Sequence, residues 1–584
     1  MDGPVALAAR RLAVVDVPGG DQPVANEDGR VRVVLNGEIY NHPALRADLV
    51  RTGHVFTTAS DTEVLVHLYE ERGPEFVQEL RGMFALALWD AHRRRLVLAR
   101  DAFGVKPLYY RSERGVLAFA SELRALPAGE IDLDALQGFL ALNRIPGPLS
   151  IRHGTQKLPP GHMLVWERRG EPRVERFVRP APVPAEDVRS GQGAELAEEL
   201  RARLRDSVRA HLLADVPVGM LLSGGVDSGA LTALAALEST RKLPTFTVGF
   251  EEASFDELDE AKKVAARYDT DHHELVLRPD PGLLRDLAAA FDEPLGDSSA
   301  LAAYLVCKLA SEHVKVVLTG EGGDELFGGY YTYLADGLAP RIGSAVPLLR
   351  ALVDALPGSE RRGSFVYGAK RFVRFAQLPP LERHCGWREI LSADARAELQ
   401  PPALRATYDP LAPARARFAE TAGSEVLARL QDVDIGGYLV DDLLVKTDRA
   451  SMAHSVEARV PYLDEAVAGL ALALPTRLKV HGWAKKRLLR QAVAPLLPRS
   501  VVSAKKRGFS IPAAAWLRGP LLPFVRDALS PESVRQQGFF EPRAVSRLLD
   551  QHVSGQDLSR PLWGLLMFTL WYEQASAHPI AVAA

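Results

Sequence analysis

One stretch constrains the fold of this chain more than any other, the sequence VGMLLSGGVDSGALTALAALE at 218–238. A short apolar run, a Ser-Gly-Gly turn and apolar residues at helical spacing predict a strand, a tight turn and a helix. Glycine lets a backbone approach a ligand closely, and the first amides of a helix attract anions. Asp227 would oppose a bare anion, so we expect a divalent cation between its carboxylate and phosphate oxygens. The alternative is a turn that only caps a helix.

The phosphate-binding motifs of other nucleotide-binding proteins do not fit this turn. It lacks the Gly-Lys-Ser/Thr of a Walker loop and the spacing of Gly-x-Gly-x-x-Gly. The turn therefore indicates a different class of phosphate site.

A second glycine-rich turn, in VVLTGEGGDELFGGYYTY at 316–333, also follows an apolar run. Glu321, Asp324 and Glu325 crowd this turn, and their mutual repulsion predicts a cationic partner. Because parallel strands end at one edge of a sheet, we expect Asp227 and Asp324 to face the same ligand. The alternative is a solvated acidic loop, which suits Glu325 better than Asp324.

Patterning divides the chain into three parts. Residues 1–130 show short apolar runs with turns, and two helical patterns at HPALRADLVRTG and DTEVLVHLYEERG. Residues 131–193 are rich in proline turns and are interpreted as a linking region. Residues 194–584 alternate helical patterns with apolar runs (VPVGMLL, TFTVGF and VKVVLTG), which predicts an α/β domain with a parallel sheet, and are mainly helical after about 410.

Composition excludes several classes of function. The net charge of −3 and the absence of a clustered basic region argue against nucleic-acid binding. No apolar run reaches membrane-spanning length, so no membrane partner is expected. Cys307 and Cys385 form neither a disulfide framework nor a metal-ligand spacing. We therefore expect a cytoplasmic protein.

Taken together, the motifs resemble those of the glutamine-hydrolysing asparagine synthetases. The matching segments are SGGVDS at 223–228, TGEGGDELFGGY at 319–330, NGEIYN at 36–41, LRGMFALALWD at 80–90, ARDAFGVKPLYY at 99–110, DDLLVKTDRASMAHSVEARVPYLD at 441–464, KKRLLR at 485–490 and KKRGFSIP at 505–512. Each is weak alone, but their joint order is highly specific. The resemblance implies an α+β stacked-sheet amidotransferase domain of the N-terminal nucleophile hydrolase type, followed by an α/β ATP pyrophosphatase domain.

For the second domain, the resemblance implies an AMP-forming carbon–nitrogen ligase. ATP adenylates the side-chain carboxylate of aspartate, and ammonia displaces AMP to give asparagine. Adenylation is needed because a carboxylate is a poor electrophile, and charge that develops on phosphate oxygens must be stabilised. The family also suggests Mg²⁺ and a homodimer, although oligomeric state is not readable from the residues.

The resemblance assigns residues of this domain by motif. Pyrophosphate is expected at Ser223, Gly224, Gly225, Asp227 and Ser228. Adenine is expected against Leu222 and Val248, and the ribose or adenylate at Thr319 and Gly320. Asp227 and Asp324 would bind Mg²⁺. Glu321 would assist ammonia addition, and Lys486 would neutralise the α-phosphate, with Lys485 one step of register away.

For the first domain, the resemblance implies a glutamine pocket without its nucleophile. Arg11 would hold the α-carboxylate of glutamine, Asn36 and Gly37 the oxyanion, and Glu38 and Asp61 the α-amino group.

The family nucleophile is a cysteine directly after the initiator methionine. Here position 2 is Asp2, and no cysteine precedes Cys307. We therefore expect an N-terminally incomplete domain, and a chain that uses ammonia instead of glutamine. A start of the natural protein further upstream is favoured over a shortened enzyme.

Two alternative functions stay open. Amide-forming enzymes of specialised metabolism, such as β-lactam synthetases and lasso-peptide cyclases, resemble the family and act on other carboxylates. Glu321 favours attack by ammonia over ring closure, but the residues that would select aspartate cannot be identified from the sequence. A catalytically silent scaffold is the second alternative, and the presence of Asp227, Asp324, Glu321 and Lys486 weighs against it.

Overall fold

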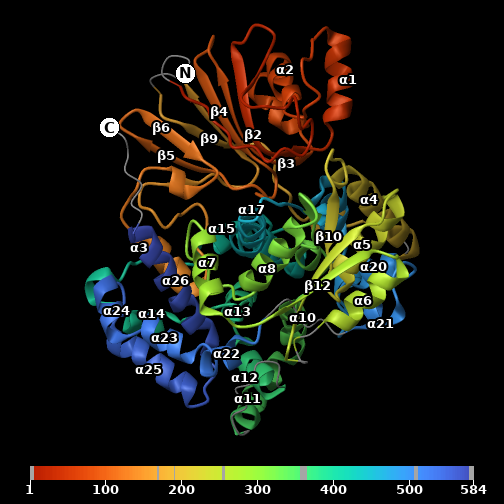
Figure 1. Cartoon of the computed structure of the whole chain (residues 1–584). Coiled ribbons are helices and arrows are strands. Elements are labelled where there is room, and N and C mark those ends of the chain that lie inside the picture. Colours follow the sequence, from red (N-terminus) through yellow and green to blue (C-terminus); the bar gives the residue numbers. More distant parts are fainter. Residues whose placement is uncertain are drawn as a thin grey trace.

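The computed structural model describes residues 5–167, 170–189, 191, 193–252, 255, 257–355, 365–504 and 511–577. Its chain folds into an N-terminal part built on antiparallel sheets and a larger part built on a parallel sheet with many helices (Figure 1). Most of the KKRGFSIP motif, residues 505–510, lies outside the described residues, as does position 2.

The N-terminal part contains two antiparallel sheets. The larger has the order β1 (Val24–Ala25), β2 (Val31–Ile39), β3 (Gly82–Asp90), β4 (Arg95–Arg100), β8 (His162–Glu167) and β9 (Arg173–Arg176). The smaller has the order β6 (Val116–Ala120), β5 (Tyr109–Glu113) and β7 (Gln156–Lys157). The two expected helices are α1 (His42–Thr52) and α2 (Glu63–Arg72).

Side chains that point alternately to the two faces of the central strands create the layers of the N-terminal part. On β2, Val33 and Leu35 pack in the cluster that includes α1 and α2, whereas Val34 points to the opposite face. That opposite face packs against Leu117 and Phe119 of the smaller sheet. Because successive side chains of a strand point to opposite faces, the large sheet is buried on both sides. The expected stacked-sheet arrangement is therefore present.

The interval expected to link the domains contributes strands to both sheets. After α3 (Leu133–Leu142), β7 joins the smaller sheet, and β8 pairs antiparallel with β4. The strands between the proline-rich turns pair with strands that are distant in sequence. The local sequence cannot reveal this pairing, because the same turn residues occur both between strands of one sheet and in linkers between domains.

The larger part is built on a parallel five-stranded sheet. Its order is β12 (Asp271–Leu277), β11 (Pro244–Phe250), β10 (Val218–Leu221), β13 (Val316–Leu318) and β14 (Glu457–Arg459). The three expected strands are β10, β11 and β13, and the parallel sheet is confirmed. Helices α4 (Gly193–His211), α5 (Val226–Glu238) and α6 (Leu258–Arg267) cover one face, and α7 (Pro281–Ala290) and α8 (Ala300–Ser311) cover the other.

The remaining chain is mainly helical, as expected after about 410. Its helices are α9 (Gly323–Phe327), α10 (Tyr331–Ile342), α11 (Val346–Asp354), α12 (Phe365–Phe375), α13 (Pro380–Gly386), α14 (Ala393–Leu399), α15 (Ala412–Glu420), α16 (Val426–Asp434), a π-helical segment (Ile435–Leu444), α17 (Val445–Met452), α18 (Glu465–Ala473), α19 (Thr476–Lys479), α20 (Arg487–Val493), α21 (Arg499–Ser503), α22 (Ala513–Arg518), α23 (Leu522–Ala528), α24 (Pro531–Gln537), α25 (Pro542–Val553) and α26 (Ser559–Ala577). Within the described ranges, no helix has both the length and the apolar character required to cross a membrane.

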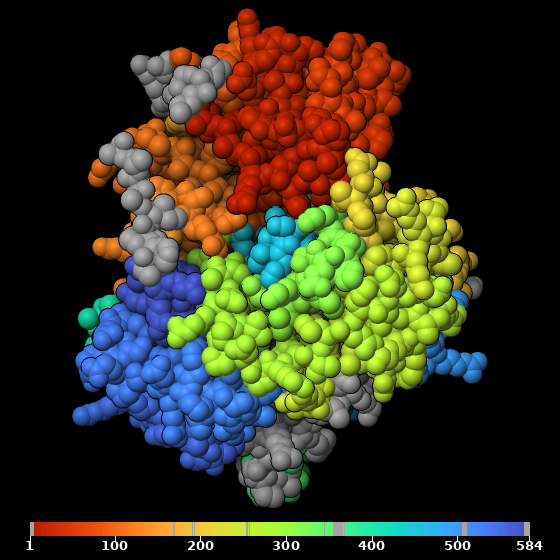
Figure 2. All heavy atoms as spheres, viewed as in Figure 1, coloured from red at the N-terminus to blue at the C-terminus, as the bar shows by residue number. Residues whose placement is uncertain are grey.

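The two parts meet through buried and partly buried charge pairs. In Figure 2 the N-terminal atoms, in red and orange, form an upper lobe that meets the yellow, green and cyan atoms of the larger part. Arg81 donates from Nε to Asp464 Oδ2 at 2.8 Å, and Lys106 Nζ lies 3.3 Å from Asp448 Oδ1. These contacts fix the position of the first domain on the second.

Candidate active sites

A cavity of about 760 Å³ lies in the larger part, where β10, β11 and β13 end. Loops after neighbouring parallel strands converge at this edge, which is where open α/β sheets bind ligands. The lining includes every residue expected at the synthetase site: Leu222, Ser223, Gly224, Gly225, Asp227, Ser228, Val248, Thr319, Gly320, Glu321, Asp324, Lys485 and Lys486. The structure therefore brings the whole set to one place, while their roles stay predictions.

The Ser-Gly-Gly turn is held by its own hydroxyls. The backbone amide of Ser223 donates to Ser228 Oγ at 3.0 Å, and the two hydroxyl oxygens lie 2.9 Å apart. A Cβ on Gly224 would lie 2.9 Å from Glu260 Cβ, so only glycine fits there without a shift. The result is a compact turn that places the N-terminus of α5 at the cavity, suited to phosphate oxygens.

Two carboxylates and one ammonium meet at the floor of the cavity. Lys486 forms an ion pair with Asp227 Oδ2, and its Nζ lies 2.5 Å from Asp324 Oδ1. Lys486 is buried and has φ of 51°, a left-handed conformation that the surrounding structure must enforce. Asp227 Oδ1 is buried without a hydrogen bond.

This donor set fits the Mg²⁺ that the resemblance led us to expect, which remains a prediction. Converging carboxylate oxygens beside a phosphate site are the ligands that Mg²⁺ prefers. The buried Oδ1 of Asp227 is the oxygen that a cation would satisfy.

The neighbouring Lys485 has a different environment. Its Nζ is buried without a hydrogen-bond partner and lies 3.3 Å from the centre of the Tyr331 ring. Burial, and then the charge of Lys486, lowers the pKa of Lys485 to about 7. The structure thus separates two lysines that the sequence left one register step apart, because only Lys486 touches both carboxylates.

Glu321 is oriented by α17. Thr447 Oγ1 donates to Glu321 Oε1 at 3.4 Å, and the adjacent Lys446 Nζ lies 3.0 Å from Asp297 Oδ2. Burial opposes the charge of Lys446, but Asp297 and Glu321 outweigh burial and raise its pKa above the usual value. Sequence reasoning missed Lys446 and Thr447 as lining residues, although both lie in the motif DDLLVKTDR.

Glu325 is not exposed to solvent, unlike the residues of the solvated acidic loop that we considered as an alternative. It is buried, and the hydroxyl of Tyr330 donates to its carboxylate. Burial raises the pKa of Glu325 to about 7. Glu325 is not among the residues that line the cavity.

The expected adenine and ribose residues lie beside the Ser-Gly-Gly turn. The amide of Leu222 donates to Phe246 O at 2.9 Å, and Thr247 Oγ1 donates to Leu222 O at 2.6 Å, so Leu222 extends the sheet pairing. A Cβ on Gly320 would lie 3.2 Å from Asp227 Cβ, so the loop after β13 passes close to α5.

Four of the five residues expected at the glutamine site lie together in the N-terminal part. Asn36, Gly37 and Glu38 are consecutive on β2, and Asp61 Oδ2 accepts from the amide of the next residue, Ile39, at 2.8 Å. Burial raises the pKa of both Glu38 and Asp61. Two buried carboxylates close together suit a bound ammonium group, which would neutralise them.

Arg11 lies in a loop that adjoins this cluster. Its guanidinium donates to the carbonyl oxygens of Val15 and of Asp16, the latter at 2.9 Å. The loop is fixed to the segment before Asp61, because the amide of Ala59 donates to Asp16 Oδ2 at 2.8 Å. The structure thus places Arg11 near the cluster, with its donors used by its own loop.

Arg459, which sequence reasoning missed, touches both sites. Its Nη2 lies 3.4 Å from Glu38 Oε1, and its carbonyl oxygen accepts from the amide of Thr319 at 2.9 Å. The side chain is fully buried. No local pattern could reveal this role, because the contact joins residues far apart in the sequence.

Comparisons with known proteins agree with this geometry. The family described as asparagine synthase matches residues 199–573, and the glutamine amidotransferase domain matches residues 1–178. The N-terminal domain is therefore present, and the expectation that its N-terminal region is missing is not supported.

Individual relatives span nearly the whole chain. Asparagine synthetase [glutamine-hydrolyzing] 1 of Bacillus subtilis is 34% identical over 98% of this chain and 90% of its own length. Asparagine synthetase [glutamine-hydrolyzing] 3 of the same organism is 30% identical over 86% of this chain and 79% of its own. The amidase chry2 of Gibberella zeae is 28% identical over 95% of this chain and 88% of its own.

Proposed function

The chain belongs to the asparagine synthase family, and from that premise we propose that it is an ATP-dependent, AMP-forming ligase that converts aspartate to asparagine. The observation that carries the proposal is the convergence of the Ser-Gly-Gly turn, Asp227, Asp324, Lys486 and Glu321 on one cavity. This arrangement supports activation of a carboxylate followed by its amination.

In the first step, a carboxylate oxygen of the acceptor attacks the α-phosphorus of ATP, and pyrophosphate leaves. The amides and hydroxyls around Ser223 would bind the departing phosphates. Asp227 and Asp324 would hold Mg²⁺, which would supply positive charge that stabilises the phosphate oxygens. Lys486 stands beside both carboxylates and would stabilise charge that develops on the α-phosphate.

In the second step, ammonia attacks the acyl carbon, and AMP leaves with the bonding electrons. Glu321 lines the cavity and is oriented by Thr447. Its carboxylate would accept a hydrogen bond from ammonia and then take the proton that the new amide loses. Ammonium at neutral pH must lose a proton before it can attack, which makes a nearby base useful.

The source of the amide nitrogen depends on whether a cysteine of this chain can act as the nucleophile that hydrolyses glutamine. The sequence has only Cys307 and Cys385. Both are buried, and burial raises each pKa to about 12, so neither thiol forms a thiolate near neutral pH. We therefore propose that the polypeptide of residues 1–584 draws on ammonia, while Glu38 and Asp61 retain the acidic part of a glutamine pocket.

A second candidate is amide formation on a different carboxylate. The similarity to the amidase chry2 over 95% of this chain supports it, because a differently named enzyme shares nearly the whole length. Lys446, beside Glu321, is a cation that could orient an acceptor carboxylate in either case.

Exchange of labelled pyrophosphate into ATP distinguishes these candidates. Exchange that depends on aspartate, with equal amounts of AMP, pyrophosphate and asparagine formed when ammonium is added, supports asparagine synthesis. Exchange only with another carboxylate supports the second candidate. Absence of exchange with every carboxylate tested would contradict both and leave a silent scaffold, and Asp324→Asn provides the inactive control.

A further inference from the structure

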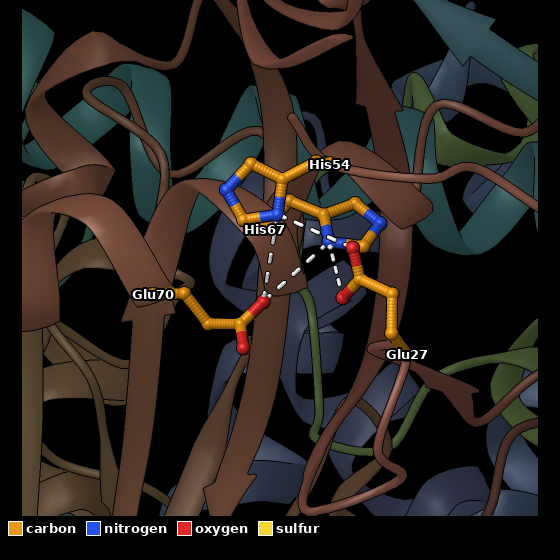
Figure 3. Close-up of side chains that lie close together, drawn as sticks. All are labelled: Glu27, His54, His67 and Glu70. Atoms are coloured by element: carbon orange, nitrogen blue, oxygen red, sulfur yellow. Dashed lines mark ion pairs between the residues drawn. The ribbon is translucent and has the colours of Figure 1, made fainter. Parts of the chain in front are cut away.

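Four side chains of types that can bind a metal cluster in the N-terminal domain, and none of them belongs to the residue sets of the two sites described above. Glu27 lies in the turn between β1 and β2, His54 follows the end of α1, and His67 and Glu70 lie on α2. Because His67 and Glu70 are three residues apart on a helix, they share one face. Figure 3 shows the two imidazoles and two carboxylates directed toward one another, and one ligand atom from each lies within 4.8 Å of the others.

The separations within the cluster are close to the edges of a small coordination tetrahedron, although most are longer and each histidine lies nearest to a different oxygen of Glu27. His67 Nδ1 lies 3.3 Å from Glu27 Oε2 and 3.5 Å from Glu70 Oε2. His54 Nδ1 lies 3.4 Å from Glu27 Oε1 and 3.9 Å from Glu70 Oε2. Ligands about 2.05 Å from a tetrahedral Zn²⁺ ion are about 3.3 Å apart, so the wider separations in the cluster, which reach up to 4.8 Å, would shorten when an ion binds.

His67 provides an independent reason for a ligand. The residue is fully buried and neither ring nitrogen forms a hydrogen bond, although Nδ1 lies beside the carboxylates of the cluster and Nε2 lies 3.8 Å from Glu63 Oε1. A buried polar group without a partner is costly, and most such groups in native proteins are satisfied. The Nδ1 atom points into the cluster, so an ion there would satisfy it.

Neighbouring groups orient the ligands as in metal sites. His54 Nε2 lies 3.1 Å from Glu71 Oε1, which directs Nδ1 toward the cluster. Glu27 Oε1 accepts from the amide of Val55 at 3.0 Å, and Glu70 Oε1 accepts from the side chain of Asn26 at 2.7 Å. Each carboxylate is thereby anchored through one oxygen while the other faces His67.

We propose that Glu27, His54, His67 and Glu70 bind one divalent transition-metal ion, with Zn²⁺ the best fit. Two imidazoles favour zinc over magnesium, and four protein ligands are typical of a structural site. The ion would tie the β1–β2 turn and the end of α1 to α2. The partial exposure of Glu27 and Glu70, whose side chains are 37% and 32% accessible, gives the ion a route from solvent.

Zinc stoichiometry tests the proposal directly. The full chain, freed of metal and without nucleotide, should take up one Zn²⁺, as measured by elemental analysis and by competition with a chromogenic chelator. Glu27→Gln and His54→Ala should abolish this binding. Glu71→Ala should weaken it about 10- to 100-fold, because it removes only the group that orients His54.

Two controls separate this site from others. His153→Ala removes an exposed histidine that pairs with Asp132, and it should leave zinc binding unchanged. Asp324→Asn alters the ATP cavity and should also retain the ion. Co²⁺ bound by the unaltered protein should show the intense visible bands of tetrahedral coordination, a readout that requires no variant to fold.

A protonated histidine between carboxylates is the competing explanation. It predicts that the unaltered chain binds no Zn²⁺ and shows no tetrahedral Co²⁺ spectrum, and either result would overturn the proposal. Retention of the ion by folded Glu27→Gln and His54→Ala would do the same. Loss of the ion in Asp324→Asn alone would assign it to the ATP cavity and refute the site.

Discussion

Replacing Lys486 by methionine should lower aspartate-dependent pyrophosphate exchange by at least about 100-fold. Lys486 contacts the carboxylates of both Asp227 and Asp324 and is a buried cation that lines the cavity of the predicted phosphate site. Methionine keeps much of the side-chain volume but removes the ammonium group. The change therefore tests charge more than packing.

The magnitude follows from the bonds that the ammonium group would make to phosphate oxygens in the transition state. A hydrogen bond to a charged group contributes about 1.5–3 kcal/mol, so two such bonds, equal in number to the present carboxylate contacts, amount to about 3–6 kcal/mol. Since about 1.4 kcal/mol corresponds to a factor of ten in rate, complete loss of this stabilisation in the transition state would slow exchange about 10²- to 10⁴-fold. The lower bound applies if Mg²⁺ compensates for part of the lost charge.

The matched control is the neighbouring Lys485→Met. Its ammonium contacts the Tyr331 ring and has a pKa of about 7, so only about half of it is charged at neutral pH. We expect a loss of less than about tenfold, which should shrink as the pH rises from about 6 to about 9, because the native amine is then neutral. Thermal unfolding of both variants checks that they fold.

The opposite ranking would refute this reasoning. If Lys485→Met lost more exchange than Lys486→Met while both variants unfolded at the same temperature, the phosphate-neutralising role would belong to Lys485. Full activity of Lys486→Met would show that the ion pairs serve only folding.

Three further changes test other parts of the structure. Asp324→Asn should abolish pyrophosphate exchange, because it removes one of the two carboxylates expected to bind Mg²⁺, and it should change thermal unfolding little, because Lys486 keeps its ion pair with Asp227; exchange at the native rate would exclude a metal-binding role. Gly37→Ala should destabilise the N-terminal domain strongly, since φ is 130° and the new Cβ would lie 1.9 Å from Met83 O, whereas Gly29→Ala, with φ of 72° and open space around it, should cost only about 1–2 kcal/mol in an unfolding measurement. The polypeptide of residues 1–584 should make amide from ammonium but not from glutamine, and release of glutamate from glutamine would contradict this expectation.

The synthetase site could be predicted because its residues cluster in short motifs. Ser223, Asp227 and Asp324 each follow an apolar strand, and the parallel sheet brings the ends of β10 and β13 together. Lys446 could not be found in the same way. It lies on a helix distant in sequence, and its ammonium group is stabilised in the charged form by Asp297 and Glu321, which the fold brings close to it.

The sequence by itself determined the parallel sheet, the two glycine-rich turns and the family, because these features depend on local periodicity and on residue order. Tertiary structure alone decided which of two adjacent lysines meets the carboxylates, since a left-handed turn at Lys486 sets the direction of its side chain. It also decided that Arg459 contacts Glu38 of one domain and Thr319 of the other, and that His54 and His67 share one cluster. Each of these depends on contacts between distant segments, and such contacts leave no periodic trace in the sequence.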